Sequence, residues 1–139
     1  MIHFFYEDCS PVYKTHEKKL AETIQLVEKE GFMSGDMSVV FCSDDYLLDL
    51  NKKHLNHDYF TDIITFSYNE EGLISGDLFI SLDRARDNAE KNKVSFSNEV
   101  ARLVIHGMLH LCGFNDKSQE ETKDMRLKEE EYLKMFGFT

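Results

Sequence analysis

The most constraining feature of this sequence is a long apolar run that polar side chains interrupt at regular intervals. From Val100 to Cys112 nearly every residue is apolar, which predicts a helix that is mostly buried. The exceptions are three, four and four residues apart, so they lie on one narrow stripe: Glu99, Arg102, His106 and His110. A polar stripe on a buried helix usually faces a cleft, although a surface ion pair would explain Glu99 and Arg102 equally well.

The two histidines of this stripe begin a pattern that is typical of a metal site. His106 and His110 are one helical turn apart and project from the same face. Gly113 follows where the helix should end, and it can adopt the left-handed conformation that reverses the chain. Asp116 comes three residues later, on a segment that this turn can fold back toward the histidines. Two imidazoles and a carboxylate leave a fourth position open for water, which is the layout of catalytic zinc.

One simpler interpretation competes with this metal site, and one further ligand has to be considered. Histidines four residues apart occur by chance on many helices, as ordinary core or surface residues. Cys112 could be taken for a further ligand, but it points to the opposite face from His110. We expect Cys112 to be a small buried apolar residue instead.

Length and composition predict one folded domain, residues 1–139. A hydrophobic content of 42% and a charged content of 30% argue against disorder. The sequence has no apolar run long enough to cross a membrane and no signal-peptide pattern. Its three cysteines show no repeated spacing, which favours a reducing compartment. We therefore expect a cytoplasmic protein.

The formal net charge of −10 argues against a general binder of polyanions, because long-range attraction to phosphates would be absent or reversed. A nucleic-acid substrate would need a local basic patch or a metal ion to offset this charge.

Periodicity and capping residues predict an α+β fold. Strands are expected at residues 1–6, 37–42, 61–66 and 77–81. Helices are expected from Ser10-Pro11 to Gly31, from Ser43 through Leu50, from Asp83 to near Asn92, from Ser95 or Ser97 through the histidines, and from the capping box at Ser118. Residues 51–60 are polar and are expected to form a loop. We expect four strands with about five helices packed on them.

Three segments have the order and spacing of the motifs of one known family: TDIITF at 61–66, GDLFIS at 76–81 and HGMLHLCGFND at 106–116. From Leu50 to the C-terminus the chain resembles the YbeY family of bacterial rRNA-maturation endoribonucleases. The resemblance implies a mixed four-stranded sheet, a zinc-hydrolase-like histidine helix that holds one Zn²⁺, and cleavage of single-stranded RNA. It further implies maturation of the 3′ end of small-subunit rRNA and ribosome quality control, with small ribosomal subunit proteins and a ribosome-assembly GTPase as partners.

The sequence departs from this family at two positions. Where the family usually has a third histidine, this chain has Asp116, whose carboxylate is also an acceptable zinc ligand. Where the family generally has a cleft arginine, this chain has Leu55. His54, His57 or Lys53 could supply a positive group nearby.

Three further residues match family positions near the cleft and also have ordinary structural explanations. Asp58 and Asp77 are equally suited to turns beside strands, and Thr61 to a strand.

The predicted chemistry is metal-assisted hydrolysis, in which His106 and His110 act through the metal and its water. Arg102, His54 and His57 are the candidate cleft residues. A zinc peptidase of the HExxH type would carry a glutamate where this chain has Gly107, whereas RNA supplies its own nucleophile in the 2′-hydroxyl. The alternatives are a metal-dependent peptidase or amide hydrolase, and a zinc-stabilised ribosome-binding module without turnover.

Overall fold

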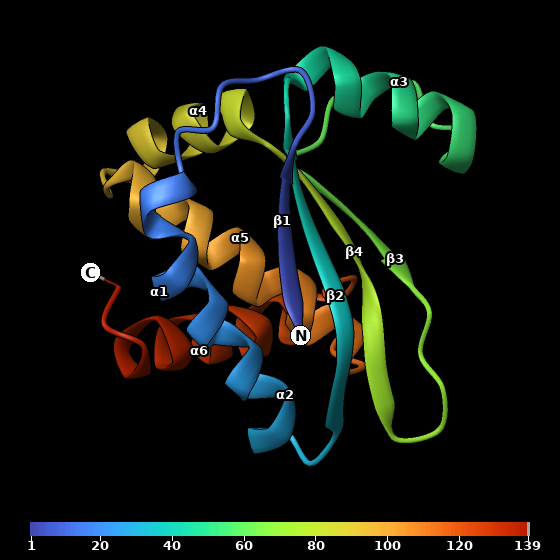
Figure 1. Ribbon diagram of the computed structural model, residues 1–139, viewed down its shortest axis with the longest axis vertical. Helices are drawn as coiled ribbons and strands as arrows, with labels where there is room; N and C mark the ends of the chain where they lie inside the picture. Colours follow the sequence, from blue (N-terminus) through green and yellow to red (C-terminus); the bar gives the residue numbers. More distant parts are fainter. Residues whose placement is uncertain (139) are drawn as a thin grey trace.

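A computed structural model describes residues 1–138, in which four strands form one mixed sheet (Figure 1). The strands are β1 (Ile2–Tyr6), β2 (Met33–Cys42), β3 (Ile63–Ser67) and β4 (Leu73–Ser81). Their order across the sheet is β1-β2-β4-β3, with β1 and β4 parallel to β2 and with β3 antiparallel to β4. The two edges of the sheet are therefore β1 and β3. The presence of both parallel and antiparallel pairs confirms the expected mixed sheet.

Most helices cover one face of this sheet, and α3 lies apart from them (Figure 1). The helices are α1 (Glu17–Ala21), α2 (Gln25–Lys29), α3 (Asp44–Leu55), α4 (Leu82–Asn92), α5 (Phe96–Leu111) and α6 (Gln119–Met135). Short 3-10 turns at Lys14–His16 and Glu22–Ile24 precede α1 and α2. The main core lies between the sheet and α5, whereas Leu47 of α3 belongs to a smaller cluster with Cys42 and Ile64. No helix within residues 1–138 is long and apolar enough to span a bilayer.

Helix α5 is the buried helix that the sequence predicts. Ser95 caps its start by accepting a hydrogen bond from the backbone amide of Asn98. The helix approaches the sheet closely at Gly107, where an added Cβ would lie 2.8 Å from a methyl group of Leu78 and 2.9 Å from one of Ile63. Glycine at this position therefore lets the histidine helix pack directly against β3 and β4.

Two of the predicted helix boundaries were wrong. The first helix begins at Lys14 as a 3-10 turn, and no side chain caps it. The residues just before it form a turn instead, in which Tyr13 is buried against Phe41. The predicted loop 51–60 starts too early, since α3 continues to Leu55 and ends where Asn56 adopts a left-handed conformation. The exposed polar residues of its last turns gave no apolar period that could reveal a helix.

Two predicted strands were too short. Both β2 and β4 begin earlier than their apolar segments, at Met33 and Leu73, and these two residues are partners in the sheet. A register shift between Ser34 and Met37 interrupts the alternation of side chains, so the early part of β2 lacks the sequence pattern of a strand.

Glycine at position 76 should be required for the close approach of β4 to its neighbour β3 and to α5. An added Cβ would lie 2.4 Å from the carbonyl oxygen of Phe66 and 3.1 Å from Leu111, so backbone would have to move. We expect Gly76→Ala to lower the free energy of unfolding by about 2–3 kcal/mol in chemical denaturation. Gly35→Ala on β2, where the nearest atom is 3.2 Å away, should cost clearly less, and equal losses would contradict this packing argument.

Candidate metal centre

The end of α5 turns the chain back toward the histidines. Gly113 has a φ of +104°, its amide donates to the carbonyl of His110 at 3.0 Å, and the amide of Phe114 donates to the carbonyl of Leu109 at 3.0 Å. These two bonds form the helix ending that the sequence predicts at this glycine. The hydroxyl of Thr122 on α6 then donates to the backbone oxygen of Asp116 at 2.9 Å, which fixes the returning segment.

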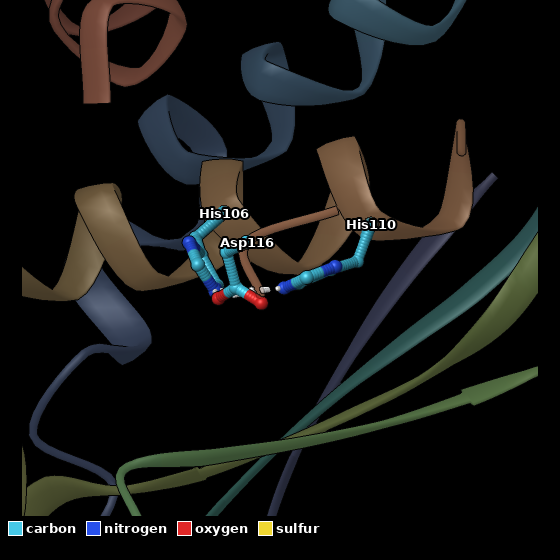
Figure 2. A group of neighbouring side chains, drawn as sticks. All are labelled: His106, His110 and Asp116. Atoms are coloured by element: carbon cyan, nitrogen blue, oxygen red, sulfur yellow. Dashed lines mark hydrogen bonds and ion pairs between the residues drawn. The ribbon is translucent and has the colours of Figure 1, made fainter. Parts of the chain in front are cut away.

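The three predicted ligands converge on one point (Figure 2). The Nε2 atoms of His106 and His110 are 3.0 Å apart, and Oδ2 of Asp116 lies 3.4 Å and 3.3 Å from them. Ligand atoms at zinc bond lengths of about 2.0–2.1 Å in a tetrahedron are separated by about 3.3 Å. The arrangement of two nitrogens and one oxygen therefore fits a divalent metal and leaves one tetrahedral position for another ligand.

Glu129 of α6 orients the first of these ligands. Its side chain is only 2% exposed, and Oε2 lies 2.6 Å from Nδ1 of His106. An ionised carboxylate can only accept, so Nδ1–H of His106 donates and Nε2 keeps its lone pair for the metal. Burial alone would raise the pKa of Glu129, but the hydrogen bond from His106 and the charge of Arg102 outweigh it and lower this pKa.

Arg102 joins the same buried network. Its guanidinium donates to both carboxylate oxygens of Glu99, at 2.9 and 2.7 Å, and to Glu129 at 3.1 Å. Burial by itself would lower the pKa of Arg102, yet the hydrogen bonds and charges of the two glutamates raise it. Glu99 is 1% exposed, so the surface ion pair considered for Glu99 and Arg102 is wrong, and the pair is part of the core of the site.

A cavity of about 230 Å³ opens over His106 and is lined by ionisable side chains from α5, from α6, from the segment before β3 and from the segment after α5. These side chains are Asp62, Arg102, His106, Asp116, Arg126 and Glu129. With Glu99 behind Arg102, carboxylates outnumber guanidinium groups by four to two. This excess of negative charge suits a divalent cation.

The other predicted cleft residues do not line this cavity. His54 packs edge-on against Phe66, with ring centroids 6.0 Å apart. His57 lines a second groove beside β3 together with Leu55. Lys53 pairs with Asp49 at 2.9 Å.

The remaining candidates have structural surroundings of their own. Asp58 pairs with Lys52 at 3.4 Å, Asp77 accepts a hydrogen bond from the hydroxyl of Tyr68 at 2.9 Å, and Thr61 lines the groove beside β3. Cys112 packs against the main core, and burial raises the pKa of its thiol to about 11, as expected of an apolar residue rather than a thiolate ligand.

Sequence reasoning missed Glu129 and Asp62. The helix predicted from Ser118 was assigned no site residue, yet Glu129 lies on the same buried stripe as Met125 and Tyr132. A carboxylate at an inward position of an amphipathic helix was the signal that could have identified it. Asp62 carried no comparable signal, because it lies just before a strand, where aspartate is common.

The chain matches the family described as Endoribonuclease YbeY over residues 6–137. It is 46% identical to Endoribonuclease YbeY of Parabacteroides distasonis, over 95% of this chain and 93% of the relative. This chain belongs to the Endoribonuclease YbeY family. Endoribonuclease YbeY of Phocaeicola vulgatus is 50% identical over 74% of this chain and 75% of its own. The solution structure of TM1509 from Thermotoga maritima, at 29% identity, has a TM-score of 0.64 and covers 98% of this chain and 91% of that one.

Membership of the YbeY family bears on the peptidase alternative. The family is named for cleavage of RNA, and this chain lacks the glutamate of the HExxH pattern. The packing of Gly107 on Leu78 and Ile63 gives the reason, since a longer side chain there would meet the sheet.

The buried carboxylate should make the stability of the metal-free protein depend on pH. The pKa of Glu129 is lowered from 4.5, so the unfolded chain binds more protons just below pH 4.5 and stability rises with pH there. This contribution is complete above about pH 4.5 and is lost as the pH falls through the lowered pKa. Glu129→Gln should flatten this dependence and lower the free energy of unfolding at pH 7 by about 2 kcal/mol.

The measurement is urea denaturation between pH 3 and pH 7 in the presence of chelator. Glu130→Gln, at the next and exposed position of α6, removes the same charge and serves as the control. A Glu129→Gln profile with the same slope as that of the control would contradict the assigned ionisation.

Proposed function

We propose that this YbeY family member is a zinc-dependent endoribonuclease that cleaves single-stranded RNA, with residues 1–139 acting as one catalytic domain. The observation that carries the proposal is the convergence of His106, His110 and Asp116 beside a carboxylate-rich cavity. In this proposal the three side chains hold one Zn²⁺. Two imidazole nitrogens favour zinc over magnesium or calcium, which prefer oxygen ligands.

Each neighbouring residue has a defined part in this site. Zinc bound there would polarise a phosphoryl oxygen and lower the pKa of its water toward about 7. Glu129 holds His106 in the tautomer that presents Nε2. Arg102 keeps Glu129 ionised, and Arg126, whose side chain is 55% exposed, lies at the rim where it can meet a phosphate. The RNA 2′-hydroxyl is a built-in nucleophile, so the absence of a base at Gly107 is less damaging for RNA cleavage than for peptide hydrolysis.

We place this activity in the cytoplasm, in maturation of the 3′ end of small-subunit rRNA and in ribosome quality control. Small ribosomal subunit proteins and a ribosome-assembly GTPase would be its partners there. The three free cysteines of the chain suit a reducing compartment. A protein partner would also supply the basic surface that a chain of net charge −10 lacks overall.

The proposal is tested by incubating the purified protein with single-stranded RNA, blunt RNA duplex and a generic peptide, with and without chelator. We expect cleavage of the single strand alone, and we expect chelator to abolish it. Peptide cleavage would select an amide hydrolase instead. A protein that binds zinc but cleaves neither substrate would be a ribosome-binding module without turnover.

Asp116 should be required for tight metal binding. We expect Asp116→Ala to weaken zinc affinity at least about 100-fold in competition with a chromophoric chelator. Substituting a residue that only hydrogen-bonds to a metal ligand already lowers metal affinity about 10- to 100-fold. Asp116→His should retain the metal. Asp124→Ala removes an exposed carboxylate from α6 and should bind zinc like the unaltered protein. Unchanged affinity in Asp116→Ala would remove Asp116 from the ligand set.

Leu55 should limit the intrinsic nuclease activity. It is 41% exposed at the end of α3 and lines the groove beside β3. A guanidinium there would hold a phosphate and stabilise developing charge, so Leu55→Arg should raise RNA cleavage at least about tenfold without changing zinc affinity.

Leu127→Arg on α6 adds the same charge at a similarly exposed position, 56%, and should leave the rate near its starting value. Equal gains in both variants would show that net charge, rather than the position of Leu55, limits cleavage.

A further inference from the structure

An RNA-cleaving role raises the question of how an acidic chain holds its substrate. The net charge is −10, and carboxylates also outnumber guanidinium groups around the candidate metal centre. Attraction to phosphates therefore contributes little beyond the metal and Arg126. The other general source of affinity for single-stranded nucleic acid is stacking of bases on aromatic side chains, which does not require a basic surface.

Exposed aromatic side chains gather around the edge strand β3. Tyr59 and Phe60 precede this strand and are 55% and 48% exposed, and Tyr68 follows it and is 59% exposed. Phe5, with 48% exposure, lies on the opposite edge strand β1. The aromatic surface is thus concentrated at the edge of the sheet that packs against the histidine helix.

The end of α3, the segment before β3 and β3 itself form a groove of about 240 Å³, which we call the β3 groove. It is lined by Asn51 and Leu55 of α3, by His57, Tyr59 and Thr61, and by the first three residues of β3. The rings of His57 and Tyr59 are stacked, with centroids 5.0 Å apart and planes at 20°, and their polar atoms are 2.9 Å apart. The buried amide of Asn51 donates to the backbone oxygen of Tyr59 at 2.9 Å. These contacts hold an exposed aromatic platform in a fixed position.

The β3 groove and the metal cavity are adjacent at residues 61–63. Thr61 and Ile63 line the groove, while Asp62 between them lines the cavity with His106 and Asp116. A polynucleotide whose phosphate lies at the metal centre would therefore bring a neighbouring base to the groove.

We propose that the β3 groove binds an unpaired nucleobase of the RNA substrate, one nucleotide along from the scissile phosphate, with Tyr59 as the stacking surface. This inference rests on the proposed endoribonuclease function and names how the substrate is held. Stacking on a side chain requires a base that has left its own helix, so the groove selects single-stranded RNA over duplex. Because every base has a π-face, little sequence preference is expected.

The chain contains no tryptophan, so one introduced tryptophan reports on one position. We would titrate zinc-loaded Tyr59→Trp with a short single-stranded 2′-O-methyl RNA, whose blocked 2′-hydroxyl prevents attack. We expect saturable quenching of the tryptophan fluorescence by the single strand and none by a blunt duplex. Phe5→Trp, on the opposite edge of the sheet, is the matched control and should not be quenched.

Substitutions at the same position measure the contribution of the ring. Tyr59→Ala should weaken binding of the single strand about 10- to 100-fold by fluorescence anisotropy of labelled RNA, while Tyr59→Phe should bind like the unaltered protein. Circular dichroism should be unchanged in both, because the ring is exposed. Undiminished binding by Tyr59→Ala, or equal quenching in Tyr59→Trp and Phe5→Trp, would overturn the proposal.

Two further outcomes separate this inference from its premise. Quenching of Tyr59→Trp by the single strand, with no cleavage by the unaltered protein of the same sequence carrying free 2′-hydroxyls, would leave the groove assignment intact and refute the nuclease. Chelator-sensitive cleavage with no loss of RNA binding in Tyr59→Ala would refute the groove and leave the nuclease intact. A response to a generic peptide but not to RNA would overturn the proposal and assign the edge of β3 to a protein strand.

Discussion

The hydrogen bond between Glu129 and His106 is the interaction on which the rest of the site depends. A carboxylate that is 2% exposed loses its hydration, and here that loss is offset by hydrogen bonds from His106 and Arg102. Arg102 in turn is held by Glu99 on its own helix. The position of α6 against α5 and the tautomer of a candidate metal ligand are therefore set by the same buried carboxylate.

The features that could be predicted from the sequence are those that short segments of the chain determine by themselves. The spacing of His106 and His110 places them on one face of any helix, and Gly113 marks the turn that follows whatever surrounds it. Asp116 and the helix cap at Ser118 also follow from the local sequence after Gly113. The structure forms the predicted capping box between Ser118 and Glu121. The α+β class was predictable because strand and helix periods follow one another clearly along the chain, whereas the mixed sheet was expected only from the resemblance to the YbeY family.

What could not be predicted depends on partners that are distant in the sequence. Glu129 follows His106 by 23 residues, and only the packing of α6 on α5 makes it a buried carboxylate instead of one of several exposed ones. The first residues of β2 are strand because Met33 pairs with Leu73, although neither flank shows alternation. The last turns of α3 have no apolar stripe, and polar contacts of Asn51 and Lys52 hold them to the segment before β3.

The acidic character of the chain and its membership of an RNA-cleaving family are compatible on physical grounds. Carboxylates around His106 would repel a phosphate, yet they also favour a divalent cation, and a bound cation reverses the local field where the scissile phosphate must lie. Elsewhere along the substrate, no such reversal occurs, and affinity has to come from groups that do not depend on charge. The exposed aromatic residues beside β3 are such groups, and their groove is lined by Thr61 and Ile63, the chain neighbours of Asp62 in the metal cavity. An acidic nuclease built this way would hold one phosphate by its metal and the neighbouring nucleotide by its base.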